Sequence, residues 1–374
     1  MNILHICNDF SYSKVHTNLY ENLDSIGIQQ IIYHPLRSTD NKGKNVFEFN
    51  VNDSEVVYSS ILKRYHRLFF KKKIDFLYDD IINKVDLDKI DCQYATTLFS
   101  DGALAYKIYK THNIPYIVAL RSTDVDLFLK LRPDLYSLGK CILLNSKKII
   151  IISPAIKYNF LRNNYFSKLE IDIKSKIELI PNGVDIYWLK NLNLYTSKSQ
   201  NSFIFIGEFS IRKNVLRLIH SLEQCRLNTP EISLHLVGGG GNRHDEVIDL
   251  IKDKPWIKYH GKVFDKERLK DIFSQCDFFA MPSIHETFGL VYIEALTQGL
   301  PILYTKGQGV DGIFDKKIGI ATNPKNTYKI SNDINWIIDN RLLLANNIKK
   351  INFTQFDWYN IAKKYKEIFE DIIK

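Results

Sequence analysis

Short apolar runs alternate with amphipathic segments along the whole chain, and the two kinds of segment predict different elements. Runs of consecutive apolar residues predict buried strands at residues 2–7, 30–33, 93–98, 115–120, 148–152, 203–207, 233–237, 257–260 and 278–281. Apolar residues at helical spacing predict helices at residues 15–26, 101–112, 215–224, 246–252, 266–275 and 356–372. Strands that alternate with helices are typical of parallel sheets, so we expect doubly wound α/β domains.

Length and turn clusters divide this pattern into two domains. A chain of 374 residues exceeds one typical hydrophobic core. The sequence PNGVD at 181–185 and a polar stretch at 191–201 interrupt the pattern before it restarts. We therefore expect four parts, which are an N-terminal acceptor-side domain at 1–186, a linker at 187–200, a second domain at 201–352, and a C-terminal segment at 353–374 that packs back on the first domain.

The composition is that of an ordinary globular protein, with 45% hydrophobic and 25% charged residues. No apolar run approaches the ~20 residues that cross a bilayer, and the N-terminus lacks the pattern of a signal peptide. Five dispersed cysteines without C-x-x-C spacing fit a reducing compartment and disfavour a structural zinc or a disulfide framework. We expect a cytoplasmic protein.

The net charge of +9 favours an anionic partner. Much of this charge gathers at residues 63–73, where six Lys and Arg residues are interleaved with aromatic and aliphatic side chains. Such a segment could contact anionic lipid headgroups at the inner face of the plasma membrane. It could equally be a solvated helix face whose aromatic side chains pack inward. No recognition motif accompanies the charge, so nucleic acid is not expected as a partner.

The segment at 276–301, CDFFAMPSIHETFGLVYIEALTQGLP, carries the strongest candidate chemistry. Glu286 lies in the loop between a buried strand and a helix that begins after Gly289, and Glu294 lies on that helix. Free N–H groups at a helix N-terminus favour an anion such as phosphate, and carboxylates on either side could bind sugar hydroxyls. The alternative is that both glutamates lie on solvated surface and that Gly289 only makes a tight turn.

The complete pattern of strand, Pro-Ser, Glu, aromatic-Gly-Leu, Glu-Ala and Gly-Leu-Pro resembles the signature of retaining GT-B-fold glycosyltransferases (family 4-like, "glycosyl transferases group 1"). The resemblance implies two Rossmann-like domains that face each other across a cleft. It implies metal-independent transfer of a hexosyl or N-acetylhexosaminyl group from a UDP- or GDP-sugar, with UDP favoured and no cofactor. The implied acceptor is a glycan or lipid-linked glycan hydroxyl in the assembly of bacterial O-antigen, capsule or a similar surface polysaccharide.

The resemblance also assigns roles to the residues of the second domain. Lys213 would neutralise the donor diphosphate together with the N–H groups at the helix N-terminus, Glu286 would bind the donor sugar or stabilise its cation, and Glu294 would bind the ribose. Further donor-binding residues are expected at Gly207, Glu208, Arg212, Gly238, Gly239, Val263, Phe288, Gly289, Leu290 and Val291. Related enzymes usually carry Arg where this chain has Glu208, and Arg212 is the neighbouring cation that could replace it.

Residues 238–241 are four glycines between a strand and a helix, and they do not support a dinucleotide site. Arg243 takes the place of the third glycine in G-x-G-x-x-G. No acidic residue ends the following strand, where the ribose of NAD would need one. Both features argue against an NAD(P)-dependent oxidoreductase.

Three residues of the first domain are candidates for the acceptor or sugar side of the site. Asp9 follows the first strand, and Arg121 and Asp124 follow the strand at 115–120. An Arg–Asp pair that only braces the loop is the alternative. The D-x-D triplets at 124–126 and 86–88 are not taken as metal sites, because acidic triplets arise easily in a chain with 42 acidic residues.

Two other functions fit parts of the sequence. A nucleotide-sugar 2-epimerase would share the two domains and would convert its substrate without an acceptor. A non-catalytic sugar- or partner-binding module would bind a donor without turnover, and the acidic residue at Glu208 keeps this alternative open.

Overall fold

The computed structural model describes residues 1–194 and 200–374. Part of the predicted linker, residues 195–199, lies outside the described residues. The chain forms two compact units. Unit 1 contains residues 1–152, 156–183 and 355–374, and unit 2 contains residues 153–155 and 184–354.

Unit 1 is built on a seven-stranded parallel sheet with the order β3-β2-β1-β4-β5-β6-β7. Neighbouring strands are parallel, so each connection needs a crossover, which accounts for the alternation of strands and helices along the chain. The strands are β1 (Asn2–Ile6), β2 (Gln29–His34), β3 (Glu55–Tyr58), β4 (Cys92–Ala95), β5 (Tyr116–Leu120), β6 (Lys148–Ile151) and β7 (Ile177–Leu179).

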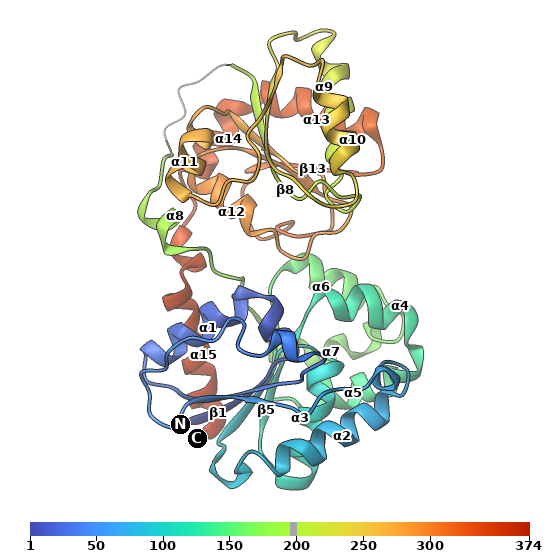
Figure 1. Cartoon of the computed structure of the whole chain (residues 1–374), viewed down its shortest axis with the longest axis vertical. Helices are drawn as coiled ribbons and strands as arrows, with labels where there is room; N and C mark the ends of the chain where they lie inside the picture. The colour runs from blue at the N-terminus through green and yellow to red at the C-terminus, as the bar shows by residue number, and fades with distance from the viewer. Residues whose placement is uncertain (195–199) are drawn as a thin grey trace. The chain divides into compact units, whose positions relative to one another are not determined.

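The helices of unit 1 cover the two faces of this sheet (Figure 1). They are α1 (Lys14–Ser25), α2 (Phe70–Ile82), α3 (Ser100–His112), α4 (Leu129–Leu131), α5 (Tyr136–Asn145), α6 (Pro154–Leu161), α7 (Glu170–Ile173) and α15 (Trp358–Ile373). A 3₁₀ turn, η3 (Arg64–Arg67), precedes α2.

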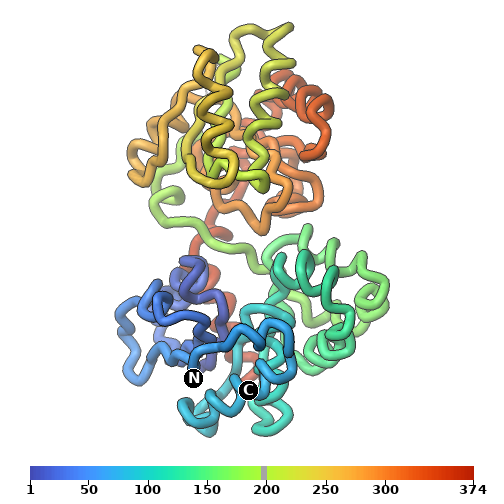
Figure 2. The backbone as a smooth tube through the Cα atoms, turned by 45° about the vertical axis from the view of Figure 1, so that its right-hand side comes forward, coloured from blue at the N-terminus to red at the C-terminus, as the bar shows by residue number. Residues whose placement is uncertain are grey.

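Helix α15 belongs to unit 1 although it comes last in the chain. It packs against α1, and the red and blue segments lie together in Figures 1 and 2. Trp358, Tyr365 and Phe369 join Ile3 and Tyr20 in one buried core cluster. A Cβ atom on Gly183 would meet the Trp358 ring at 2.6 Å, so the glycine allows this close packing.

Unit 2 repeats the same topology with a six-stranded parallel sheet, in the order β10-β9-β8-β11-β12-β13. Its strands are β8 (Ser202–Gly207), β9 (Ser233–Gly238), β10 (Ile257–Tyr259), β11 (Phe278–Ala280), β12 (Ile302–Thr305) and β13 (Gly319–Thr322). Its helices are α8 (Ile186–Lys190), α9 (Val215–Arg226), α10 (His244–Ile251), α11 (Lys266–Ser274), α12 (Leu290–Thr297), α13 (Thr327–Asp339) and α14 (Arg341–Ile348).

The strand order locates the edge at which a ligand should bind. In unit 2 the order reverses between β8 and β11, which are neighbours with Phe278 opposite Phe203. In open α/β sheets ligands bind beyond the carboxyl ends of the strands at such a switch point. The loop after β8 carries Lys213 and the loop after β11 carries Glu286, so the fold brings the two predicted catalytic residues to one place.

Candidate functional site

The candidate site begins where β11 ends and α12 starts. Gly289 precedes the helix with a φ of 77°, and a Cβ atom there would lie 2.5 Å from the Tyr292 ring and 3.1 Å from Cγ of Glu286. Among the described residues, the N–H groups of Gly289, Leu290 and Val291 have no hydrogen-bond acceptor. The helix therefore presents free donors and its positive dipole end toward the loop that holds Glu286.

The Lys213 ammonium and the Glu286 carboxylate form an ion pair at this helix. Nζ lies 2.7 Å from Oε2, and the two side chains are only 13% and 7% exposed. The Ser283 hydroxyl donates to the same oxygen over 3.4 Å, and Sδ of Met281 lies 3.7 Å from Nζ. An ammonium group has three N–H donors, so Lys213 can still bind a further anion.

Two residues that were not predicted from the sequence hold the backbone of Glu286. The side-chain carbonyl of Gln308 accepts a hydrogen bond from the Glu286 N–H over 2.7 Å, and its amide donates to the Ile284 carbonyl over 2.8 Å. The Gly309 N–H donates to the Glu286 carbonyl over 3.2 Å. These contacts fix the loop, because both backbone groups of Glu286 are occupied.

The loop after β8 is joined to the loop after β11. Asn214 adopts the left-handed conformation, with a φ of 62°, and its amide donates to the carbonyls of Pro282 and Pro324 over 2.9 and 2.8 Å. The Ile284 N–H donates to the Arg212 carbonyl over 2.8 Å. Lys213 lies between Arg212 and Asn214, so these bonds position its side chain.

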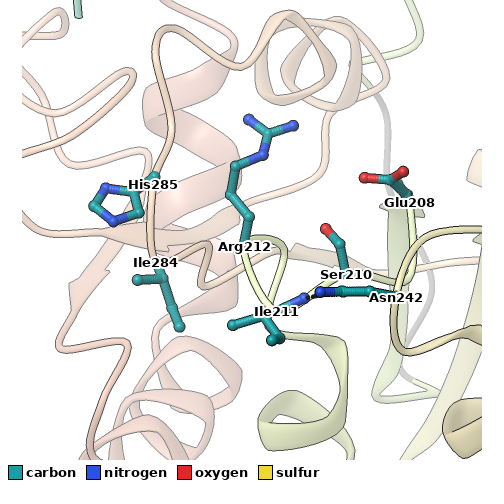
Figure 3. Close-up of a pocket in the computed structure, with 7 residues that line it drawn as sticks. All are labelled: Glu208, Ser210, Ile211, Arg212, Asn242, Ile284 and His285. Atoms are coloured by element: carbon teal, nitrogen blue, oxygen red, sulfur yellow. Dashed lines mark hydrogen bonds between the residues drawn. The ribbon is translucent and has the colours of Figure 1, made fainter. Parts of the chain in front are cut away.

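A surface pocket of about 540 Å³ lies beside this junction and is shown in Figure 3. Its lining residues are Glu208, Ser210, Ile211, Arg212, Asn242, Ile284 and His285. Glu208 and Arg212 are both exposed, and neither forms an ion pair with another described residue. The acid at Glu208 is therefore not neutralised within the protein, and Arg212 is available as a second cation for an anionic ligand.

The glycines after β9 serve the packing of the strand ends. Gly238 and Gly239 have φ angles of 130° and 134°. A Cβ atom on Gly238 would lie 1.9 Å from the Gly207 carbonyl oxygen of the neighbouring strand β8. Gly238 is thus required by the close approach of two strands. Contact of Gly207, Gly238 and Gly239 with a donor stays a prediction, as does contact of the half-buried Val263 and of the buried Phe288.

Glu294 lies on α12 in an environment that disfavours its charge. Burial is the main cause that raises its pKa to about 7; the carboxylate of Asp185 adds to this effect, and Lys266 opposes it. Asp185 comes from the PNGVD segment and is hydrogen-bonded to Lys266. No described residue hydrogen-bonds the Glu294 carboxylate, so it can bind a ligand hydroxyl.

In unit 1, the Arg121 guanidinium lies at the carboxyl edge of the sheet among polar atoms of its own unit. It donates to the carbonyl of Thr96 over 3.3 Å, to the Asn182 side chain over 3.4 Å and to the Tyr94 hydroxyl over 3.3 Å. Burial raises the pKa of Asp9 at the same edge, and the nearby positive charge of Arg121 opposes this shift. Contact of either residue with an acceptor stays a prediction.

Asp124 braces its loop. Its carboxylate accepts hydrogen bonds from the backbone N–H groups of Leu98, Phe99 and Arg121 over 3.0, 3.2 and 2.9 Å, and the residue is fully buried. Asp124 thus braces the loop as the alternative supposed, but through backbone N–H groups and not through a pair with the Arg121 guanidinium, which donates to Thr96, Asn182 and Tyr94. Contact of Asp124 with a sugar stays a prediction.

The basic segment 63–73 is not one continuous helix. It comprises the turn η3 and the first residues of α2. Tyr65, Leu68 and Phe69 are exposed by 44%, 76% and 53%, whereas Phe70 is buried. Most of its apolar side chains therefore face solvent instead of packing inward.

Within the described residues, no group of His, Cys, Asp and Glu side chains is arranged to hold a metal ion. In the same part of the chain, no helix has both the length and the apolar character that a membrane span requires.

A solved structure of similar fold matches this chain over almost its whole length. The structure of Anabaena Alr3699/HepE in complex with UDP and glucose has a TM-score of 0.63 and 19% identity, and the match covers 99% of both chains. The chain therefore has the two-domain α/β GT-B fold that the sequence predicted.

The family model "Glycosyl transferases group 1" matches residues 193–354, and unit 2 belongs to this family. The uncharacterized glycosyltransferase MJ1178 of Methanocaldococcus jannaschii is 25% identical over 362 residues, which are 95% of this chain and 93% of the relative. The O-antigen biosynthesis glycosyltransferase WclY of Escherichia coli is 27% identical over 143 residues, which are 37% of this chain and 39% of that protein.

Proposed function

We propose that the chain is a retaining, metal-independent glycosyltransferase. It transfers a hexosyl or N-acetylhexosaminyl group from a nucleotide diphosphate sugar, with a UDP-sugar favoured, to a hydroxyl group of a glycan. One observation carries this proposal. A lysine, a carboxylate and three free backbone N–H groups meet at the N-terminus of α12, at the switch point of a Rossmann-like sheet.

The chemistry follows from charge development in the transition state. As the bond between the sugar and the diphosphate breaks, negative charge grows on the leaving phosphate and positive charge grows at the anomeric carbon. Lys213 is held by Glu286, and the N–H groups of Leu290 and Val291 are fixed at the start of α12, so these groups stabilise the phosphate with little reorganisation. Glu286 is held in place by Ser283 and Lys213, and it binds a sugar hydroxyl or stabilises the sugar cation.

Glu294 and Arg212 complete the donor site in this proposal. The Glu294 carboxylate accepts hydrogen bonds from ribose hydroxyls, and Arg212 supplies the second cation that Glu208 does not provide. In this proposal the acceptor hydroxyl attacks on the same face of the sugar as the leaving phosphate, so retention needs no covalent intermediate with the enzyme. The proton of that hydroxyl passes to the leaving phosphate oxygen.

The acceptor belongs to bacterial surface-polysaccharide assembly in this proposal. WclY acts in O-antigen biosynthesis, and its similarity to this chain supports this class of acceptor. Exposed aromatic and basic side chains at residues 63–73 support peripheral contact with an anionic membrane, at which a lipid-linked glycan would be met. A cytoplasmic location at the inner face of the plasma membrane fits these contacts.

A screen with UDP-, GDP- and ADP-sugars tests the proposal. A donor that binds only the folded protein raises the melting temperature, because binding stabilises the folded state. The donor that stabilises the protein is then incubated with and without a glycan acceptor, and the products are separated. Transfer that depends on the acceptor and on Glu286 supports the proposal. Conversion of the sugar without an acceptor would indicate an epimerase, and binding without any turnover would indicate a non-catalytic module.

A further inference from the structure

Four cations gather in a second pocket, which lies in unit 1 and which the proposed reaction does not use. The pocket has a volume of about 490 Å³ and is lined by Arg37, Leu62, Lys63, Arg64 and Arg67. We name these residues the basic pocket. Its only lining side chain without a charge is Leu62, which is buried.

The backbone brings the basic pocket together from two loops at the carboxyl edge of the sheet. Arg37 follows β2, and Lys63 follows the neighbouring strand β3. The Leu62 N–H donates to the Leu36 carbonyl over 2.8 Å, and the Leu36 N–H donates to the Ser59 hydroxyl over 2.9 Å. Ligands of parallel α/β sheets bind at this edge, so the basic pocket lies where binding sites are expected.

A buried histidine fixes the turn that carries three of the cations. The imidazole of His66 accepts a hydrogen bond from the Lys63 N–H over 3.1 Å, and the residue is 2% exposed. Burial, followed by the positive charge of Lys63, lowers the pKa of His66. The imidazole therefore stays neutral near pH 7 and can act as this acceptor.

The charges of the basic pocket are not neutralised by the protein. None of the four cations forms an ion pair with a described carboxylate. Partial burial and then the like charge of Arg67 lower the pKa of Arg37, and Asp9 is a nearby carboxylate that opposes the shift. Clustered like charges repel each other, and an anion in the pocket would remove this repulsion.

We propose that the basic pocket binds a phosphate group carried by the acceptor. One arginine guanidinium group can bind two phosphate oxygens at once. A single phosphate can therefore neutralise the charge of two of the four cations. Leu68 and Phe69 lie one and two residues beyond Arg67 and are exposed, so an apolar part attached to the phosphate has a surface to contact. This inference deepens the proposed function, since it names the chemistry of the acceptor and rests on glycosyl transfer by unit 2.

Two sources could supply the phosphate, and the test separates them. The full chain is titrated with a soluble hexose phosphate and with phosphatidylcholine vesicles that do or do not contain phosphatidylglycerol, in the presence of excess nucleotide diphosphate to fill the donor site. The variant R37Q/R67Q removes two charges from the basic pocket. The matched variant K168Q/K174Q removes two exposed charges of unit 1 that lie outside residues 63–73.

We expect R37Q/R67Q to weaken binding of the phosphate probe by about tenfold or more and K168Q/K174Q by less than about twofold. Binding of the hexose phosphate alone assigns a soluble phosphorylated acceptor, and binding of phosphatidylglycerol vesicles alone assigns a lipid phosphate; both support a phosphate site. Equal loss in the two double variants, or no binding of any phosphate probe, overturns the inference.

The same samples keep this inference separate from the proposed function. Nucleotide-sugar hydrolysis or transfer is measured in parallel with phosphate binding. If turnover persists while no phosphate probe binds, only the basic pocket inference fails. If R37Q/R67Q loses phosphate binding selectively while no nucleotide sugar is turned over, the pocket stands and the proposed function fails.

Discussion

The two units have the same order of parallel strands, but the carboxyl edges of their sheets use charge in opposite ways. In unit 2, within the part of the chain that the structure describes, the carboxylate of Glu286 bonds only to side chains, and the helix N-terminus beside it keeps free N–H groups. In unit 1 the carboxylate of Asp124 accepts hydrogen bonds from three backbone N–H groups. A common fold therefore does not decide which residue type is available to a ligand; the loops at the strand ends decide it.

The comparison is tested most severely at Glu286. We expect Glu286→Gln to lower the transfer rate by ~10²–10³-fold, because a preorganised charge at the reacting sugar is lost. Affinity for the nucleotide should change by less than about threefold, since Gln keeps the shape of the side chain. Steady-state turnover and calorimetric binding measure the two effects.

A double-mutant cycle supplies the control for Glu286. Lys213→Gln should also reduce turnover strongly, and the two substitutions together should cost much less than the product of the single effects, because the residues are directly paired. Unchanged turnover in Glu286→Gln would refute the assignment of this site.

The opposite outcome is expected at Asp124. Asp124→Ala should lower the free energy of unfolding of unit 1 by about 2–4 kcal/mol, because three buried N–H groups lose their acceptor. Thermal and denaturant unfolding of the full chain measure the effect. Asp126→Ala is the matched control, since Asp126 is about half exposed and pairs only with Lys130; its cost should stay below ~0.5 kcal/mol. If both variants were equally stable, Asp124 would be free for ligand chemistry.

Glu294 provides a test through pH. Its pKa of about 7 lies above the ordinary value of 4.5, so the folded protein holds a proton that the unfolded chain releases. This group's contribution to the free energy of unfolding should therefore decrease as the pH rises from 4.5 to about 7, and change little above that.

Binding should show the reverse trend, because only the ionised Glu294 carboxylate accepts hydrogen bonds at both oxygens. We expect affinity for a nucleotide sugar to rise by roughly five- to tenfold between pH 5.5 and pH 8. A nucleotide sugar is the suitable probe, since its diphosphate does not titrate in this range. Affinity in Glu294→Gln should be independent of pH; the same pH dependence in that variant would exclude Glu294 as the ribose ligand.

The smallest effect is expected at Glu208. Glu208→Arg places a cation beside Arg212 in the pocket of unit 2, so affinity for a nucleotide diphosphate should rise by about three- to tenfold and become more sensitive to salt. Glu208→Gln removes the negative charge only and should give about a twofold increase. A loss of affinity in Glu208→Arg would show that the acid itself contacts the donor.

The sequence predicted the repeated α/β architecture and the central features of the unit 2 site. Strands β8 and β11 and helix α12 were predictable because their apolar patterns are long or flanked by clear turn residues. Strands β3, β7, β12 and β13 were not predicted, since each has only three or four residues. Such short strands depend on pairing with a neighbour, which local sequence does not encode.

Contacts between distant segments account for what the sequence did not reveal about the sites. Gln308 binds the backbone of Glu286 from 22 positions away, and Asn214 binds Pro282 across 68 positions. Arg37 meets Arg67 only because β2 and β3 are neighbours in the sheet. In each case the residue type is common, and only the topology gives it a partner.

Helix α15 has a consequence for how the protein must be made. Its side chains Trp358, Tyr365 and Phe369 belong to the core of unit 1, yet all of unit 2 is synthesised before them. During translation, unit 1 therefore cannot complete its core until residues 355–374 have left the ribosome. The apolar surface of α1 stays uncovered until then. Unit 2 can complete its fold earlier, so the second half of the chain is expected to fold first.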